Sequence, residues 1–319
     1  MAFYIGVDIG GTNIKAGVTD GTGNIVGEAE TPTGANRPQE AVIGDILSAA
    51  DRAISAAGVL RREIFAAGVG CPGTVESSSG TVVYNNNLGW RNFPLGKLLS
   101  EAWRLPVRVE NDANAAALGE VCAGSARGAS SAMILTLGTG VGSGFVVEGR
   151  IWTGWNASAC EFGHMVIVKG GRPCTCGRRG CLEAYASATG LINMTREAMA
   201  AHPESLMNAL AEREGRVGGH TAFAAAERGD AAALRVVDEY VDYLACGVTN
   251  IVNGLQPEVV GIGGGVGRQG DRLLAPLRQK VYAEVYGGRG ERFTRLTQCT
   301  LGYRAGLVGA AMAAMQSTV

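Results

Sequence analysis

The chain has 319 residues, of which 46% are hydrophobic, and a formal net charge of −1. This length is enough to bury a sizeable core and favours two domains or one large one. A near-neutral chain without a long basic block lacks the charge pattern that wraps nucleic acid or an anionic membrane. We therefore expect small-molecule ligands and no nucleic-acid or membrane partner.

The start of the sequence and its cysteines indicate a cytoplasmic protein. The first residues run directly into an apolar strand pattern, without the basic segment and small-residue cleavage site of a signal peptide. No apolar run reaches membrane-spanning length. The eight cysteines are scattered apart from one tight group, so a disulfide framework is not indicated and a reducing compartment is expected.

The first part of the chain is predicted to alternate strands and helices, judged from the spacing of apolar residues and from turn residues. The expected elements are strands at 3–9 and 14–20, a third strand after Asp20, a helix at 38–57 ending at Gly58, a strand at 66–71, a loop-rich stretch to Trp90, a short strand at 107–109 and a helix at 112–121.

The second part combines strands with a long helical region. The expected elements are strands at 131–137 and 144–148, helices between 188 and 255 with a long one from 230 to 253, a strand ending in a glycine loop within 257–267, and a closing helix at 305–315. A strand that ends in glycines suits ligand binding at its carboxyl end.

The opening scheme of the chain occurs twice. A strand, the turn Gly10-Gly11-Thr12 and a second strand are matched later by a strand, Gly138-Thr139-Gly140 and a strand. Such self-similarity predicts a duplicated half. Small residues and a threonine in a turn can present N–H groups and a hydroxyl to phosphate oxygens, although either turn alone is ordinary hairpin chemistry. Together they predict two clamps on one polyphosphate.

Six motifs, taken in order, resemble the ROK family of bacterial sugar kinases and regulators. They are DIGGTNIKAGV, ENDANAAALGE, LGTGVGSGF, EFGHM, CTCGRRGCLE and GIGGGVG, of which the first five run from residue 8 to residue 183. The resemblance implies an α/β chain with the actin-like ATPase (ribonuclease H-like) fold, in which two related domains close around a cleft. It also suggests a homodimer.

The expected domains are an N-terminal α/β domain at 1–120, joined by the C-terminal helix at about 305–319, and a C-terminal α/β domain at 121–304 with a zinc-binding loop and a helical insertion. The resemblance implies ATP and Mg²⁺ as cofactors, with Asp8 near the metal and Gly263 to Gly265 near the adenosine. The residues expected to bind the nucleotide are Asp8, Gly10, Gly11, Thr12, Lys15, Gly138, Thr139, Gly140, Gly263, Gly264 and Gly265.

Asp112 is the expected general base. Phosphoryl transfer to a sugar needs a carboxylate positioned to take the hydroxyl proton. Asp112 follows a strand at the entry of an alanine-rich helix, where backbone N–H groups stabilise an ionised carboxyl. Taken alone, Asp112 in an Asn-Asp pair before an alanine-rich helix would be interpreted as only an N-cap. The resemblance of ENDAN favours catalysis, with Asn111 on a sugar hydroxyl, whereas Glu110 could equally be a surface residue.

A zinc site is predicted from spacing. His164, Cys174, Cys176 and Cys181 supply one imidazole and three thiolates, the soft tetrahedral set that zinc prefers. The other five cysteines are interpreted as small buried side chains. One ring nitrogen of His164 can bind zinc while the other donates to a sugar hydroxyl, so the metal is expected to be structural and not the catalyst.

The resemblance also implies a set of sugar-binding residues. They are Gly73, Asn87, Asn111, Asp112, Glu161, His164 and Glu183. For three of them a structural role is the alternative, because Glu183 could be only a first-turn helix charge, Asn87 only a turn residue and Gly73 only turn geometry. Trp90 is interpreted as a core or rim aromatic more readily than as part of the pocket.

Two stretches depart from the family pattern. Ala157 and Cys160 occupy positions where glycine is usual, which is expected to reshape the pocket, and Arg304 stands where an acidic residue is usual. The sequence gives no physical account of Arg304.

The function expected is an ATP-dependent hexose kinase acting on the 6-hydroxyl of glucose, with NNNLGW and CLEAYAS favouring a glucokinase-like enzyme. Mannose, fructose, N-acetylmannosamine and N-acetylglucosamine remain alternatives, because discrimination rests on contacts to one or two hydroxyls. Polyphosphate or ADP as the donor also stays open. A sugar-responsive regulator is disfavoured because the first strand leaves no room for an amino-terminal helix-turn-helix. A non-catalytic actin-like scaffold would not need the sugar-side residues.

Overall fold

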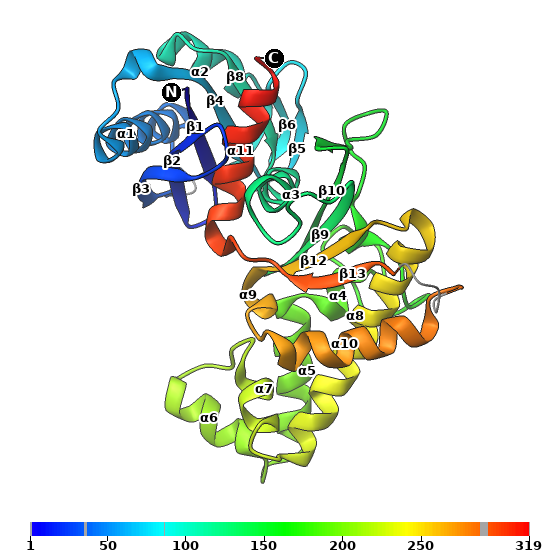
Figure 1. Cartoon of the computed structure of the whole chain (residues 1–319). Helices are drawn as coiled ribbons and strands as arrows, with labels where there is room; N and C mark the ends of the chain where they lie inside the picture. Colours follow the sequence, from blue (N-terminus) through cyan, green and yellow to red (C-terminus); the bar gives the residue numbers. More distant parts are fainter. Residues whose placement is uncertain (1, 35–36, 86, 288–292, 319) are drawn as a thin grey trace. The chain divides into compact units, whose positions relative to one another are not determined.

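The computed structural model describes residues 2–34, 37–85, 87–287 and 293–318. The described residues form two five-stranded sheets and one three-stranded sheet, with helices packed on them (Figure 1). The chain divides into two compact units. Unit 1 comprises Met1–Ile134, Gly144–Cys160 and Thr300–Val319, and unit 2 comprises Leu135–Ser143 and Glu161–Cys299. The domain boundaries expected at residues 120 and 304 stay a prediction.

The first sheet has the order β3-β2-β1-β4-β8. Its strands are β1 (Phe3–Ile9), β2 (Asn13–Asp20), β3 (Ile25–Pro32), β4 (Ile64–Cys71) and β8 (Val107–Asn111). The first three form an antiparallel meander, whereas β4 and β8 run parallel to β1. Asp8 therefore lies opposite Gly70, and Cys71 opposite Asn111. The carboxyl ends of three parallel strands meet at one edge of the sheet.

The second sheet repeats this arrangement, with the order β11-β10-β9-β12-β13. Its strands are β9 (Ser131–Leu137), β10 (Val141–Val147), β11 (Arg150–Ile151), β12 (Val259–Gly263) and β13 (Arg295–Gln298). Each sheet thus has a hairpin at one side and a further parallel strand beyond its central pair, as the internal repeat in the sequence predicts. The boundary between the units passes through β9 and β10.

Four helices cover unit 1, counted over its described residues. They are α1 (Gln39–Ala57), α2 (Leu95–Trp103), α3 (Asp112–Ala123) and α11 (Ala305–Gln316), with the short 3₁₀ turns η1 (Arg61–Glu63) and η3 (Gly302–Arg304) beside them. Helix α11 lies next to α3 and against β4 (Figure 1). A Cβ on Gly68 would lie 1.7 Å from the Ala310 carbonyl oxygen, and one on Gly309 would lie 1.6 Å from that of Ala115. Glycine at both positions allows this backbone contact.

The helices of unit 2 pack mainly around α8. In chain order they are α4 (Glu183–Ala186), α5 (Ala188–Ala201), α6 (Leu206–Glu214), α7 (Thr221–Ala226), α8 (Ala231–Leu255), α9 (Gly264–Gly267) and α10 (Asp271–Glu284), with the 3₁₀ turn η2 (Phe162–His164) before them. The buried Tyr240 of α8 donates its hydroxyl to the Ala186 carbonyl at 2.6 Å. Within the described part of the chain, no helix has both the length and the apolar character needed to cross a bilayer.

The stretch before Trp90, expected to be rich in loops, instead forms a small antiparallel sheet. Its strands are β5 (Thr74–Glu76), β6 (Thr81–Asn85) and β7 (Trp90–Phe93). Trp90 is only 1% exposed, and its ring centroid lies 4.5 Å from that of Phe93. Its interpretation as a core aromatic is thereby confirmed. The sequence reading also missed α2, α10 and β13.

Candidate active site

Two aspartates lie at the carboxyl edge of the first sheet. Asp8 is the second-last residue of β1 and Asp112 begins α3, and both lie near Gly70 of β4. A Cβ placed on Gly70 would lie 3.7 Å from both the Asp8 Oδ1 and the Asp112 Cα. Burial and the neighbouring Asp112 raise the pKa of Asp8 to about 6, and Lys15 opposes that rise. A cation bound here would favour the ionised form of Asp8.

The helix cap at this edge is Asn111 and not Asp112. The Asn111 Oδ1 accepts the backbone N–H groups of Ala113 at 2.9 Å and Asn114 at 3.1 Å. The Asp112 Oδ1 also accepts the Ala113 N–H, at 3.0 Å. Because Asn111 already satisfies the first turn, the interpretation of Asp112 as merely the N-cap is wrong. The predicted place of Asp112, after a strand at the entry of a helix, is confirmed.

Gly73 and Asn87 lie on connections beside this edge. The Asn111 Nδ2 donates to the Gly73 carbonyl at 3.0 Å. Gly73 has φ +94°, and a Cβ there would lie 2.1 Å from the Tyr84 carbonyl oxygen, so glycine is required. The exposed Asn87 places its Nδ2 4.0 Å from the Cβ position of Gly11. The structure therefore brings Gly73 to Asn111 and Asn87 to the first glycine turn.

Sequence reasoning missed Asn85, which holds the connection that carries Asn87. The side chain of Asn85 is buried, with the residue 1% exposed. Its Nδ2 donates to the Pro72 carbonyl at 2.8 Å, and its Oδ1 accepts the Leu88 N–H at 2.9 Å. A buried asparagine that bonds backbone on both sides fixes a turn. The only feature of the sequence that pointed to Asn85 was the run of three asparagines at 85–87.

The first glycine turn, Gly10–Asn13, joins β1 to β2. The Gly10 N–H donates to the Asn13 carbonyl at 2.9 Å, which closes the turn. Thr33 braces it, because its hydroxyl donates to the Gly10 carbonyl at 2.6 Å and its N–H to the Thr12 carbonyl at 2.8 Å. Lys15 in β2 has its Nζ 5.1 Å from the Tyr303 ring centroid. The turn leaves Gly11 and Thr12 exposed for a ligand.

The second glycine turn, Gly138–Gly140, joins β9 to β10. The Gly138 N–H donates to the Gly140 carbonyl at 3.0 Å. Helix α5 holds the turn from one side, because the Ala188 N–H donates to the Gly138 carbonyl at 2.8 Å and the Thr189 hydroxyl to the Thr139 carbonyl at 2.8 Å. Thr189 was not recognised from the sequence.

The glycines 263–265 end β12 and begin α9, next to the second glycine turn. Gly264 has φ +77°, and a Cβ there would lie 2.5 Å from the backbone nitrogen of Leu137, the residue before that turn. Only glycine permits this backbone on backbone packing. Within unit 2, two of the three predicted nucleotide segments therefore lie together.

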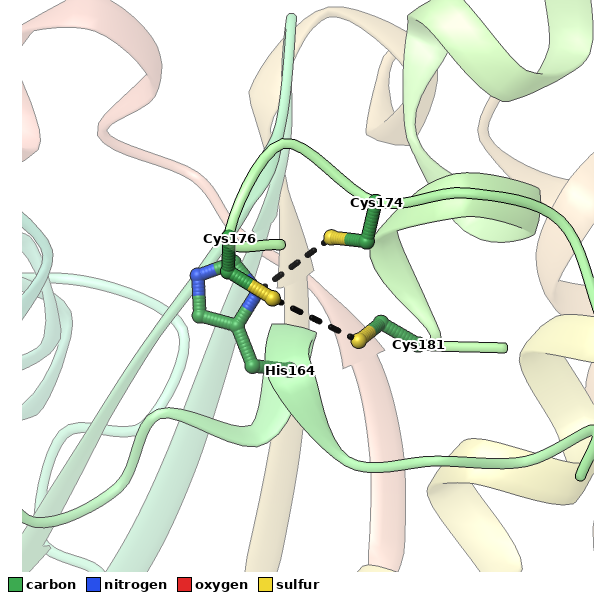
Figure 2. A group of neighbouring side chains, drawn as sticks. All are labelled: His164, Cys174, Cys176 and Cys181. Atoms are coloured by element: carbon green, nitrogen blue, oxygen red, sulfur yellow. Dashed lines mark hydrogen bonds between the residues drawn. The ribbon is translucent and has the colours of Figure 1, made fainter. Parts of the chain in front are cut away.

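The four predicted zinc ligands form one cluster (Figure 2). Their donor atoms, on His164, Cys174, Cys176 and Cys181, all lie within 4.8 Å of one another. In a tetrahedral site with Zn–S bonds of about 2.3 Å, two sulfurs lie roughly 3.8 Å apart. The sulfurs of Cys176 and Cys181 are 3.7 Å apart, and the His164 Nδ1 is 3.6 Å from the Cys174 sulfur. The donor set and spacing fit a metal ion.

Glu161 precedes the 3₁₀ turn η2 and His164 ends it, and the His164 N–H donates to the Glu161 carbonyl at 3.0 Å. The Phe162 N–H donates to the Ser143 hydroxyl at 3.0 Å, which holds this turn on β10. Glu183 begins α4, and its carboxylate bonds the Val141 N–H and the Thr175 hydroxyl. Unit 2 thus brings the two glutamates, His164 and the second glycine turn into one region.

Glu110 is not a surface residue. It is 1% exposed, and its carboxylate accepts two bonds from the Arg108 guanidinium, at 2.8 and 2.6 Å. The Ser77 hydroxyl donates to its other oxygen at 2.8 Å. A charge buried at this depth needs such partners. Glu110 therefore has a structural role, because its bonds hold the end of β8 in place.

The structure shows how the three residues that depart from the family pattern are accommodated. Ala157 and Cys160 adopt φ values of +60° and +67°, the left-handed region that favours glycine. Their side chains are therefore accommodated at the cost of backbone strain. Arg304 makes a two-point pair with Glu28 of β3, at 3.0 and 2.5 Å, and its guanidinium lies 5.4 Å from the Tyr303 ring centroid.

Known proteins resemble the chain along nearly its whole length. The ROK family model matches residues 4–317. A glucokinase of Halalkalibacterium halodurans is 41% identical over 310 residues, which cover 96% of this chain and 93% of that protein.

Two solved structures share the architecture. A ROK family glucokinase from Streptomyces griseus, in complex with glucose and AMPPNP, has a TM-score of 0.84 and 34% identity, covering 99% of this chain and 100% of that one. A ROK hexokinase from Thermus thermophilus has a TM-score of 0.83 and 34% identity, covering 99% of both chains. The predicted actin-like ATPase fold with two domains is confirmed. The chain belongs to the ROK family.

Proposed function

We propose that the chain is an ATP-dependent glucose kinase that phosphorylates the 6-hydroxyl, with Asp112 as the general base. The activity is supported by the similarity to glucokinases, one of them in complex with glucose and AMPPNP. The single observation that carries the assignment of the base is the place of Asp112. It begins α3 beside Asp8, and Asn111 satisfies the helix cap.

Asp112 takes the proton of the sugar hydroxyl as the hydroxyl oxygen attacks the γ-phosphorus of ATP, and the bond from that phosphorus to the β–γ bridging oxygen breaks, so that ADP leaves with the electron pair. The helix entry favours the carboxylate over the neutral acid and fixes its direction. Asn111 has one amide N–H on the Gly73 carbonyl, and its second N–H is assigned to a sugar hydroxyl. Burial raises the pKa of the neighbouring Cys71 to about 12, so its thiol stays protonated and does not compete as a nucleophile.

The glycine turns are assigned to the phosphates of ATP, with Thr12 and Thr139 supplying hydroxyls, and Gly263 to Gly265 are assigned to the adenosine. Asp8 would hold Mg²⁺, directly or through water. A cation at this position would offset the burial and the neighbouring Asp112 carboxylate, which together raise the pKa of Asp8. When bound, Mg²⁺ neutralises charge on the transferred phosphoryl group. Lys15 lies on the strand that leaves the first glycine turn and adds a positive charge there.

Zinc is assigned to His164, Cys174, Cys176 and Cys181. The metal would be structural, because four protein donors fill a tetrahedral shell and leave no position for a reacting group. Glu161, His164 and Glu183 are assigned to the sugar, together with Gly73 and Asn87. With the His164 Nδ1 facing the Cys174 sulfur, the Nε2 is the nitrogen assigned to a sugar hydroxyl.

We assign a homodimer and a cytoplasmic location, and a division into domains at 1–120 with 305–319 and at 121–304. Gel filtration with light scattering tests the first, because a dimer of this 32.9 kDa chain would have about twice that mass.

A coupled ADP-release assay across a hexose panel tests the activity. The panel contains glucose, mannose, fructose, N-acetylmannosamine and N-acetylglucosamine, with ATP, ADP and polyphosphate as separate donors. We expect the highest kcat/KM with glucose and ATP. A better substrate among the other sugars would change the specificity assigned, and release with no sugar at all would favour a regulator or a scaffold.

A further inference from the structure

The carboxylate of Glu183 joins two parts of unit 2 that have separate roles in the proposed function. Its Oε1 accepts the hydroxyl of Thr175 at 2.9 Å, and its Oε2 accepts the backbone N–H of Val141 at 3.1 Å. Thr175 lies between Cys174 and Cys176 in the loop that carries the proposed zinc ligands. Val141 directly follows the second glycine turn. One side chain therefore connects the loop to the turn.

The contact with the turn is tight. A Cβ built on Gly140 would lie 2.3 Å from the Glu183 Oε2, so glycine at 140 lets the carboxylate rest directly on the backbone. Val141 is buried, which raises the cost of leaving its N–H without a partner. A shift of the carboxylate therefore has to move the turn or break this bond.

The contact with the loop depends on how the loop is ordered. Residues 165–182 are joined by isolated bridges, Val166 with Cys181 and Pro173 with Arg179. Backbone bonds such as that from the Cys174 N–H to the Arg178 carbonyl at 2.9 Å shape this segment, and metal binding by its three cysteines would order it further. The Cys174 sulfur lies 3.6 Å from the Glu183 Oε1, but a zinc-bound thiolate has no proton to donate. With zinc bound, Thr175 is therefore the donor from the loop.

The second glycine turn also has an anchor that does not involve the loop. The Thr189 hydroxyl, at the start of α5, donates to the Thr139 carbonyl at 2.8 Å. The Ala188 N–H donates to the Gly138 carbonyl at 2.8 Å. The two anchors hold the same turn from different elements, which supplies a matched control.

We propose that Glu183, in addition to its assigned contact with the sugar, is a positioning residue through which metal binding to the loop orders the second glycine turn. Zinc fixes Thr175, Thr175 fixes the Glu183 carboxylate, and the carboxylate holds the Val141 N–H and the turn before it. The claim that an ordered turn helps to bind ATP phosphates rests on the proposed function. The coupling between the loop and the turn does not. Because coupling between two sites is reciprocal, a ligand that orders the turn tightens the binding of zinc.

Amide hydrogen exchange of residues 137–143, measured without nucleotide or sugar, tests the coupling. Wild-type protein is compared after zinc loading and after removal of metal by a chelator, with zinc content measured in each sample. Loss of one hydrogen bond changes a local opening equilibrium by about two- to tenfold. We therefore expect zinc to slow exchange at Val141 by about two- to tenfold.

Three variants separate the anchors. In Glu183→Ala the zinc effect at Val141 should vanish, and in Thr175→Val it should fall toward a ratio of one while zinc remains bound. In Thr189→Val, exchange should be faster than in the wild type both with and without zinc. The ratio of the rate without zinc to the rate with zinc should stay as in the wild type. Thr175→Val decides the matter if Glu183→Ala does not fold.

Equal exchange at Val141 with and without zinc in the wild type would overturn the coupling. A wild-type ratio retained in Thr175→Val or in Glu183→Ala would assign it to another residue and overturn the role of Glu183. Because the assay contains no substrate, a protein that shows the coupling but no kinase activity would contradict only the proposed function.

Discussion

The carboxylates of unit 1 and the Cys/His cluster of unit 2 are held by different forces. Asp8 and Asp112 lie at the ends of a strand and a helix whose positions are set by a packed core. The cluster lies on a loop that is held by turn-type backbone bonds, such as that from the Ile167 N–H to the Gly180 carbonyl at 2.9 Å, and not by a sheet or a long helix, and Cys176 is exposed. Packing positions the first site, whereas the second depends on donor chemistry. Variants of the carboxylates should therefore change catalysis, whereas variants of the cluster should change the order that depends on metal binding.

The largest effect is expected at Asp112. Asp112→Ala removes the proton acceptor, and kcat should fall by about 10²- to 10⁴-fold because general bases contribute that much. Glucose binding and Tm should change little, since Asn111 keeps the α3 cap. Steady-state kinetics and calorimetry measure the two quantities. Asp51→Ala, at an exposed aspartate of α1, is the matched control and should keep full activity.

The ionised form of Asp8 is expected to lower the stability of the native state, although the same carboxylate is proposed to bind magnesium. Its pKa is raised from 3.8 to about 6, so the native state binds this proton more tightly than the unfolded state does. Wild-type stability should therefore fall as pH rises from about 4 to about 6, by up to about 3 kcal/mol for this group. Asp8→Asn removes that dependence, and its stability relative to wild type should rise over the same window.

The same variant should lose most magnesium-dependent activity, because a neutral amide binds the cation poorly. Urea unfolding at pH 4 and pH 7 and an activity titration with Mg²⁺ supply the measurements. A variant with unchanged magnesium dependence would remove Asp8 from the metal site.

The Cys/His cluster should respond to the loss of a single donor. Cys176→Ser replaces an exposed side chain, so little packing is lost, yet zinc content should fall well below one per chain. Glucose affinity should drop by about tenfold or more, together with Tm, because the metal orders the loop that carries His164. Cys246→Ser, at a cysteine outside the cluster, is the control. Equal zinc content in both variants would argue against the site.

The smallest effect is expected in the stretch that departs from the family pattern. Ala157 and Cys160 adopt left-handed backbone conformations, so Ala157→Gly and Cys160→Gly should each stabilise unit 1 by about 1 kcal/mol or less. Ala159→Gly in the same stretch lacks a positive φ and should be neutral or destabilising. Thermal unfolding of the three variants provides the comparison.

Much of the fold could be predicted because its signals are local. Helix α1 ends at Gly58, which is left-handed, and β9 has the bounds that apolar spacing predicts. The sheet β5-β6-β7 was missed because its strands have three to five residues and are specified by pairing. Short strands leave too little alternation to detect.

The candidate site shows the same limit. Asp112 was predicted because strand, helix entry and motif coincide in sequence. The alternative that Glu110 is a surface residue stayed open because one of its partners, Ser77, lies 33 positions away. The bond from Glu183 to Val141 spans 42 positions, and nothing local indicates it. Long-range side-chain contacts of this kind are set by the folded backbone, so they become visible only in the structure.

The most direct test of the account is ³¹P NMR of the product formed from glucose and MgATP by the wild-type protein. The account predicts a single sugar phosphate, with phosphorus on the 6-oxygen of glucose, formed together with an equal amount of ADP. Formation of ADP without any sugar phosphate, or a phosphate on another oxygen, would contradict it.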